Sequence, residues 1–136
     1  MNSDLDAFHE LCYYTLAHTD PAFIHQHVVD AIAAQTCTAD DKPIKLTFAL
    51  VGLYLHLEKN RTGKQVQLAH MKLARRKQAW PTFPLPAFRG AITVHDVLAV
   101  DPGPARDAMI HRWCASAWDA FRDSRPVIVA HLSALE

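Results

Sequence analysis

The sequence lacks an apolar stretch long enough to cross a membrane. Its longest, LTFALVGLYLHL (46–57), is well short of the ~20 residues that a membrane-spanning helix needs. The N-terminal segment MNSDLDAFHE is acidic and does not have the basic-then-apolar order of a signal peptide. These absences predict a cytoplasmic protein that does not engage a membrane.

Cysteine is scarce, and its spacing suggests no pairing. The three cysteines, Cys12, Cys37 and Cys114, are odd in number, far apart and without a Cys-x-x-Cys pair. This pattern indicates reduced thiols that fill small spaces in a core. Cys114, in RWCASAW, falls on the apolar arc of its helix, so we expect a buried side chain and not a nucleophile.

The sequence also lacks the familiar catalytic motifs. It contains no Gly-x-Gly-x-x-Gly, no Walker loop, no Gly-x-Ser-x-Gly and no His-Glu-x-x-His. The basic run ARRK (74–77) has no recognition motif or exposed aromatic residues near it, and cations at a helix C-terminus stabilise the helix dipole in any case. We therefore predict no nucleic-acid partner, and whether the chain is an enzyme stays open.

Basic residues are missing from the first third of the chain. Residues 1–41 have no Lys or Arg and a net charge of −7, whereas residues 42–92 have ten basic residues against Glu58 alone, a net charge of +9. The total over the chain is zero. One interpretation is a basic surface over residues 59–89 that binds an acidic or anionic partner. The other is that the acidic first third packs beside the basic middle.

What the sequence does contain is helical periodicity. Half of its 136 residues are apolar, which fits a single domain over residues 1–136. Apolar residues recur at helical spacing, and Asp20, Pro21, Pro43, Thr62 and Thr93 are typical of helix starts. The predicted helices are 4–18, 21–35, 43–59, 63–78, 94–100, 104–123 and a last one from about 126.

Residues 80–90, WPTFPLPAFRG, interrupt this helical pattern. Three prolines and a glycine exclude a regular helix, yet Trp80, Phe83, Leu85 and Phe88 are too apolar for a solvated linker. We expect an ordered strap that lies across the helices. The predicted fold is therefore all-α, a single compact bundle of six to seven helices with a proline-rich apolar strap.

Histidines are the polar residues that the predicted helices bring closest to the core. At about 100° per residue, His25 falls on the apolar arc of its helix, whereas His27 and Asp30 fall on the opposite side. His56 borders the mostly apolar helix 43–59, and His70 lies on the inner face of the next helix.

Inward histidines from three consecutive helices suggest two alternatives. His25, His56 and His70 could together bind a divalent metal ion such as zinc or nickel, with Glu58 or Asp30 as a base. Alternatively, each is a core histidine bonded to a backbone carbonyl or to a neighbour such as Tyr54, and there is no cofactor.

A second candidate group is a small binding surface. His27 and Asp30 are three residues apart, so the carboxylate could hold the ring and raise its basicity, although such pairs are more often surface pairs. Tyr54 and Glu58 on the helix 43–59 complete this candidate pocket.

Four segments carry a resemblance to a family. They are HELCYYTLAHTDPAFIHQHVVDAIAAQ (9–35), KPIKLTFALVGLYLHLEKNRTGKQVQLAH (42–70), WPTFPLPAFRGAITVHDVL (80–98) and WCASAWDAF (113–121). The chain resembles a family of uncharacterised bacterial proteins, a helical domain of unknown function. The resemblance implies a free-standing helical domain and no particular activity.

Two functions from different classes follow. The first is association, as a homodimer or with another protein or a small ligand. The alternative is a metal-dependent bundle enzyme that uses His25, His56 and His70.

Overall fold

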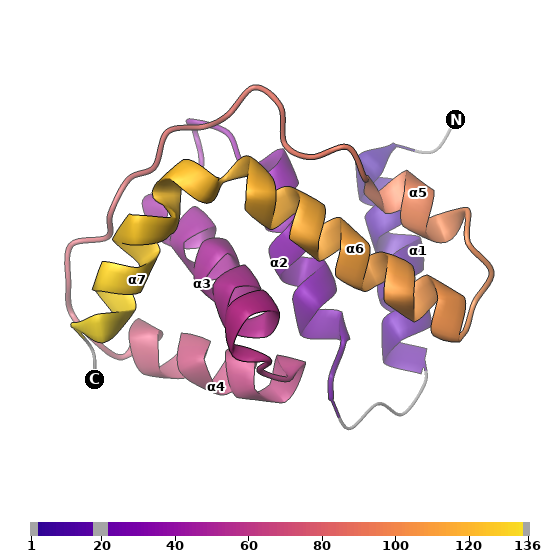
Figure 1. Ribbon diagram of the computed structural model, residues 1–136, viewed down its shortest axis with the longest axis horizontal. Helices are drawn as coiled ribbons and strands as arrows, with labels where there is room; N and C mark the ends of the chain where they lie inside the picture. Colours follow the sequence, from indigo (N-terminus) through magenta and orange to yellow (C-terminus); the bar gives the residue numbers. More distant parts are fainter. Residues whose placement is uncertain (1–2, 18–21, 135–136) are drawn as a thin grey trace.

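The computed structural model describes residues 3–17 and 22–134, which fold into helices and contain no strand (Figure 1). The all-α prediction is therefore confirmed for the described residues. Their helices are α1 (Asp4–Ala17), α2 (His25–Thr36), α3 (Pro43–Lys59), α4 (Gly63–Ala74), α5 (Val94–Leu98), α6 (Pro104–Ala120), the 3-10 turn η1 (Arg122–Ser124) and α7 (Arg125–Ser133). No helix within these ranges is both long and apolar enough to cross a membrane.

Local sequence signals fix several of the helix ends. The Thr62 hydroxyl accepts a hydrogen bond from the backbone N–H of Gln65, and the Gln65 side chain accepts one from the backbone N–H of Thr62, which forms a capping box at the start of α4. Thr93 and Asp96 form the same box at α5, and Pro43 occupies the first turn of α3. The predicted cap Asp20–Pro21 lies outside the described residues, and α2 begins at His25.

Helix α2 is enclosed on several sides. It packs against α1, α3, α4 and α6, and Figure 1 shows it between α1 and α3 with α6 running across. Its fully buried apolar residues are Val28, Ala31 and Ala34, which belong to the same core cluster as Leu50 and Leu53 of α3. Because α2 has neighbours on both of its long sides, its polar residues also have to be accommodated inside the protein.

The predicted strap is present as an irregular segment between α4 and α5. In Figure 1 it runs past the outside of α7 and over the ends of α3 and α2. Trp80, Phe83 and Leu85 pack against the core, and Trp80 meets Phe48 of α3 edge to face. Phe88 departs from the prediction because it is 69% exposed.

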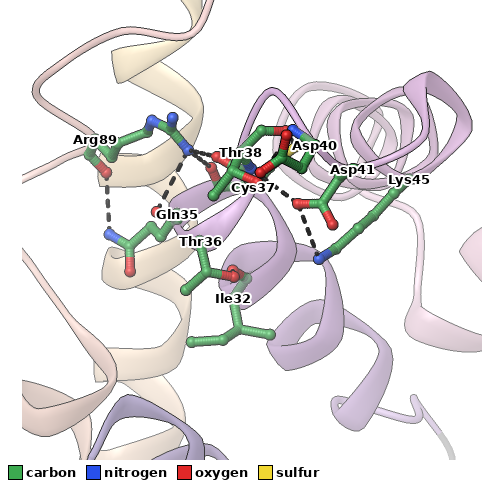
Figure 2. Close-up of polar contacts among 10 residues, drawn as sticks. Ile32, Gln35, Thr36, Cys37, Thr38, Asp40, Asp41, Lys45 and Arg89 are labelled. Carbon is green, nitrogen blue, oxygen red and sulfur yellow. Dashed lines mark hydrogen bonds and ion pairs between the residues drawn. The ribbon is translucent and has the colours of Figure 1, made fainter.

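Arg89 fastens this strap to the C-terminus of α2 (Figure 2). Its Nη1 donates to the carbonyl oxygens of Ala34 at 3.0 Å and Cys37 at 2.7 Å, while its Nε donates to Pro86 O at 2.8 Å. The last carbonyls of a helix have no partner within the helix and carry partial negative charge. A guanidinium with several donors is suited to bind them together.

Gln35 completes this junction between α2, the strap and α6. Its Nε2 donates to the carbonyl oxygens of Arg89 at 3.0 Å and Ile92 at 2.7 Å, and its Oε1 accepts from Trp113 Nε1 at 2.7 Å. A half-buried side chain at the end of α2 therefore holds the strap and α6 in register.

The role of Arg89 is open to a direct test. We expect Arg89→Ala to lower the free energy of unfolding by about 2–4 kcal/mol, because several carbonyl groups lose a charged donor. Arg112→Ala, at an exposed position on α6, is the matched control and should change it by less than about 0.5 kcal/mol. Urea denaturation of both variants measures the difference, and equal losses would contradict the proposed role of Arg89.

Candidate functional site

Three histidines from three helices are in contact with one another. The His27 ring on α2 stacks on the His56 ring on α3, with centroids 3.5 Å apart and planes at 17°. His111 on α6 meets His56 edge to face at 5.2 Å. His27 is 4% exposed, His56 is half-buried and His111 is exposed. This histidine column (His27, His56 and His111) therefore leads from the core to the surface.

The predicted orientation of α2 is wrong for two of its polar residues. His27 and Asp30, which were expected on the side away from the core, are 4% and 3% exposed. His25, expected inward, is half-buried. Helical periodicity predicts a single buried face, whereas α2 packs against other helices on more than one side. His27 and Asp30 are consequently not a surface pair.

Asp30 is a carboxyl group buried against the backbone of α3. Its Oδ1 accepts a hydrogen bond from Gln26 Nε2 at 3.2 Å, and its Oδ2 has no hydrogen-bond partner among the described residues. A Cβ atom built on Gly52 would overlap Oδ2, so the glycine provides the space for the carboxyl group. Burial raises the pKa of Asp30 well above its ordinary value, which favours the neutral acid.

Cys114 lies beside this group and is fully buried, as predicted. Its Sγ is 3.6 Å from the carbonyl oxygen of His27, to which the thiol donates. Burial raises the thiol pKa strongly, and the nearby Asp30 raises it further. A thiol of this kind does not form the thiolate that nucleophilic catalysis needs. Cys12 and Cys37 are free thiols as well.

The three histidines of the predicted metal site have separate partners. Thr15 directs its hydroxyl hydrogen to the carbonyls of Leu11 and Cys12, so its oxygen accepts from His25 Nδ1 at 2.9 Å. His70 Nε2 donates to Phe48 O at 2.8 Å, and its ring stacks on Phe48.

His56 belongs to the histidine column and not to a group with the other two. Burial lowers the pKa of His25, His56 and His70, which keeps these imidazoles neutral. Within residues 3–17 and 22–134, no group of three or more His, Cys, Asp or Glu side chains is placed to hold a metal ion. The structure does not support the three-histidine metal enzyme.

Tyr54 and Glu58 form a junction between α3, α6 and α7. The Glu58 carboxylate accepts from Arg125 Nη2 at 2.6 Å, from Arg125 Nε at 2.9 Å and from Trp118 Nε1 at 2.8 Å. The Arg125 guanidinium also lies 5.7 Å from the centre of the Tyr54 ring. Hydrogen bonds from Arg125 lower the pKa of Glu58, so the carboxylate is a weak base in an ion pair.

An apolar groove lies between α1, α2 and the start of α3. It has a volume of about 450 Å³, and its rim carries Asp4, Thr36 and Lys45. Its walls are formed by Leu5, Phe8, Val29, Ile32 and Ala33. The rim charges have partners within the chain, since Asp4 binds His95 and Lys45 binds Asp41.

Two helix faces on different sides of the molecule combine exposed apolar residues with charge of one sign. The α1 acidic face consists of Leu5, Asp6, Glu10, Tyr13 and Leu16. The α4 basic face consists of Lys64, Leu68, Met71, Lys72 and Arg75. At 100° per residue each set spans less than half of its helix circumference, on the side away from the core.

Packing within the chain brings only part of the acidic first third next to the basic middle of the sequence. Helix α2 packs on α3 and α4, as the intramolecular interpretation expects. However, Figure 1 shows α1 beyond α2 at one side and α4 below α3 at the other. The acidic residues of α1 and the basic residues of α4 are therefore displayed on separate surfaces.

Sequence reasoning missed His111, Gln26 and the contact between Gly52 and Asp30. His111 is 55 residues from His56 along the chain, so no local spacing links them. Gln26 is four residues before Asp30 on the same helix, and this spacing is the one signal that could have indicated their hydrogen bond.

A double-mutant cycle tests whether Gly52 provides the space that the Asp30 carboxyl group occupies. We expect Gly52→Ala to lower the free energy of unfolding by about 2–3 kcal/mol, because the new methyl group overlaps a buried carboxyl group. In an Asp30→Ala background the same change should be neutral or slightly stabilising, because alanine is the better helix former. Chemical denaturation of the four proteins measures the coupling, and additive effects would show that the two residues do not compete for space.

The raised pKa of Asp30 predicts a pH dependence with a definite sign. In the unfolded chain Asp30 loses its proton near its ordinary pKa of 3.8, whereas in the folded state it keeps the proton to higher pH. The free energy of unfolding therefore falls as the pH rises from 3.8 through the folded pKa. Asp30→Asn should remove this part of the dependence and gain stability relative to the wild type as the pH rises. Urea titrations from pH 4 to 8 measure it. A constant difference between the two proteins would refute the prediction.

Comparison with known proteins gives a family and no activity. A model of a Family of unknown function (DUF5946) matches residues 5–122, from α1 to the start of η1. Neither a search of curated proteins nor a search of solved structures found a match to the chain. The family match covers most of the helical bundle described above. The chain belongs to this family of unknown function, DUF5946.

Proposed function

We propose that the chain is an association module that binds further copies of itself, with the α1 acidic face of one copy docking on the α4 basic face of the next. The observation that carries the proposal is the presence of two faces with exposed apolar residues and opposite charge on one chain. The metal-dependent alternative has no comparable support.

The apolar residues supply the attraction. Leu5 and Leu16 are each 60% exposed on α1, and Leu68 and Met71 are 57% and 47% exposed on α4. Full burial of one such side chain is worth about 1.5–3 kcal/mol, although association costs reduce the net gain. The groove next to Leu5 offers apolar walls for a side chain of the docking copy.

The charges select which faces meet. Two α1 acidic faces brought together would place Asp6 and Glu10 opposite the same groups of the partner, and two α4 basic faces would do the same with cations. Like charges across an interface disfavour such pairings. Pairing α1 with α4 places Asp6 and Glu10 near Lys64, Lys72 and Arg75, so the head-to-tail arrangement is favoured.

A head-to-tail contact has a consequence for the size of the assembly. An open assembly keeps one free α1 face at one end and one free α4 face at the other, so the contact produces rings or growing chains and not a closed symmetric dimer. The average mass should rise with concentration above the 15.2 kDa of the monomer. Because exposed charges take part, salt should weaken the assembly.

Charge reversal on one face at a time tests the proposal. Asp6→Lys with Glu10→Lys gives a chain with two basic faces, and Lys64→Glu with Lys72→Glu gives a chain with two acidic faces. We expect each variant alone to self-associate at least tenfold more weakly than the wild type, because its faces repel. Mixing the two variants restores opposite charges across the contact and should restore the assembly, as measured by sedimentation velocity at low salt.

A matched control separates this effect from a general effect of charge. Asp101→Lys with Asp123→Lys, and Arg112→Glu with Arg122→Glu, change the net charge by the same +4 and −4 at exposed residues outside both faces, and each should associate like the wild type. Circular dichroism verifies that each variant is folded, which matters for Asp6 because its carboxylate accepts a hydrogen bond from the backbone N–H of Ser3 at the start of α1. A wild type that stays monomeric at millimolar concentration in low salt, or a mixture that fails to associate, would overturn the proposal.

A further inference from the structure

The solvent end of the histidine column brings two imidazole nitrogens together. His56 Nε2 and His111 Nδ1 are 3.3 Å apart, on two different helices. His56 is half-buried and His111 is exposed, so the space around these nitrogens is open to solvent on the His111 side.

The backbone determines which nitrogen of His56 carries the hydrogen. His56 Nδ1 is 3.4 Å from the carbonyl oxygen of Arg61, which only accepts hydrogen bonds, so Nδ1 is the protonated nitrogen of the neutral ring. The lone pair of His56 is therefore on Nε2 and points toward His111. A backbone carbonyl that binds the second ring nitrogen is the usual support for a histidine that binds a metal ion.

The separation of the two nitrogens matches a shared metal ion. Two imidazoles bound to a tetrahedral ion at 2.0–2.1 Å have their nitrogens about 3.3–3.4 Å apart. Without the ion, the same distance fits an N–H···N hydrogen bond in which His111 Nδ1 donates to His56 Nε2, so binding the metal replaces that proton. With the ion bound, the hydrogen of His111 is on Nε2, and water can hydrogen-bond to this N–H because the ring is exposed. This leaves the lone pair of His111 on Nδ1, which faces His56.

We propose that His56 Nε2 and His111 Nδ1 together bind one divalent transition-metal ion of the zinc and nickel class, with water in the remaining positions. This site differs from a site of His25, His56 and His70, and it does not depend on association. The stacked ring of His27 limits the rotation of His56. In the described residues no third His, Cys, Asp or Glu completes the group, so we expect micromolar and not nanomolar affinity.

Titration of tag-free protein with zinc chloride in a calorimeter tests the proposal. The wild type should bind one zinc ion at His56 and His111, and His111→Ala should weaken that binding at least tenfold. Because His111 is exposed, its removal is compatible with folding. His56→Ala should weaken binding in the same way, and circular dichroism verifies that this variant keeps its helices.

His95→Ala is the matched control, since His95 is an exposed histidine that binds Asp4 elsewhere on the surface. It should bind zinc like the wild type. Spectra of the cobalt-loaded wild type should show tetrahedral absorption that His111→Ala loses. Absence of zinc binding by the wild type at millimolar concentration, or unchanged binding by His111→Ala, would overturn the proposal.

Discussion

The enclosure of α2 by four other helices governs how the bundle is packed. A helix with neighbours on both long sides cannot direct its polar residues to water, and each buried polar group needs a partner or space. Gln26 binds Asp30, Gln35 binds Trp113 and the strap, and Arg89 binds the carbonyls at the end of the helix. These contacts extend from α2 to the strap and α6, so the packing of one helix fixes the positions of several others.

The same enclosure explains the polar groups in the centre of the bundle. Asp30 is tolerated because Gly52 leaves room for it and because burial favours its neutral form. His27 cannot reach the surface and instead stacks on His56, which in turn meets His111. The histidine column is thus the path by which a buried polar residue of α2 is connected, through ring contacts, to the outside of α6.

On the outer surface, the sign of the charge distinguishes one helix face from another. Helix α1 and helix α4 each leave apolar residues exposed on the side away from the core, and the charges around them have opposite sign. Net neutrality of the whole chain conceals this arrangement. A neutral protein with separated charges repels itself in matched orientations and attracts itself in the crossed one, which favours directional over symmetric contacts.

The helical class and many of the helix ends can be predicted from local patterns of residues. Helical periodicity, the capping residues Thr62 and Thr93, and the prolines at helix starts act within a few residues, so they can be recognised without the fold. The strap was predictable for the same reason, because proline excludes a helix while Trp80, Phe83 and Leu85 favour packing on the core.

Tertiary structure alone decided which side of α2 is buried and which histidines meet. Periodicity gives the angle of a side chain around its own helix, but not which helices lie on each side of it. For α2, helices lie on more than one side, so His27 is buried against the prediction while His25 is only half-buried. The pairing of His56 with His111 depends on how α3 and α6 cross, and packing between distant segments sets that crossing.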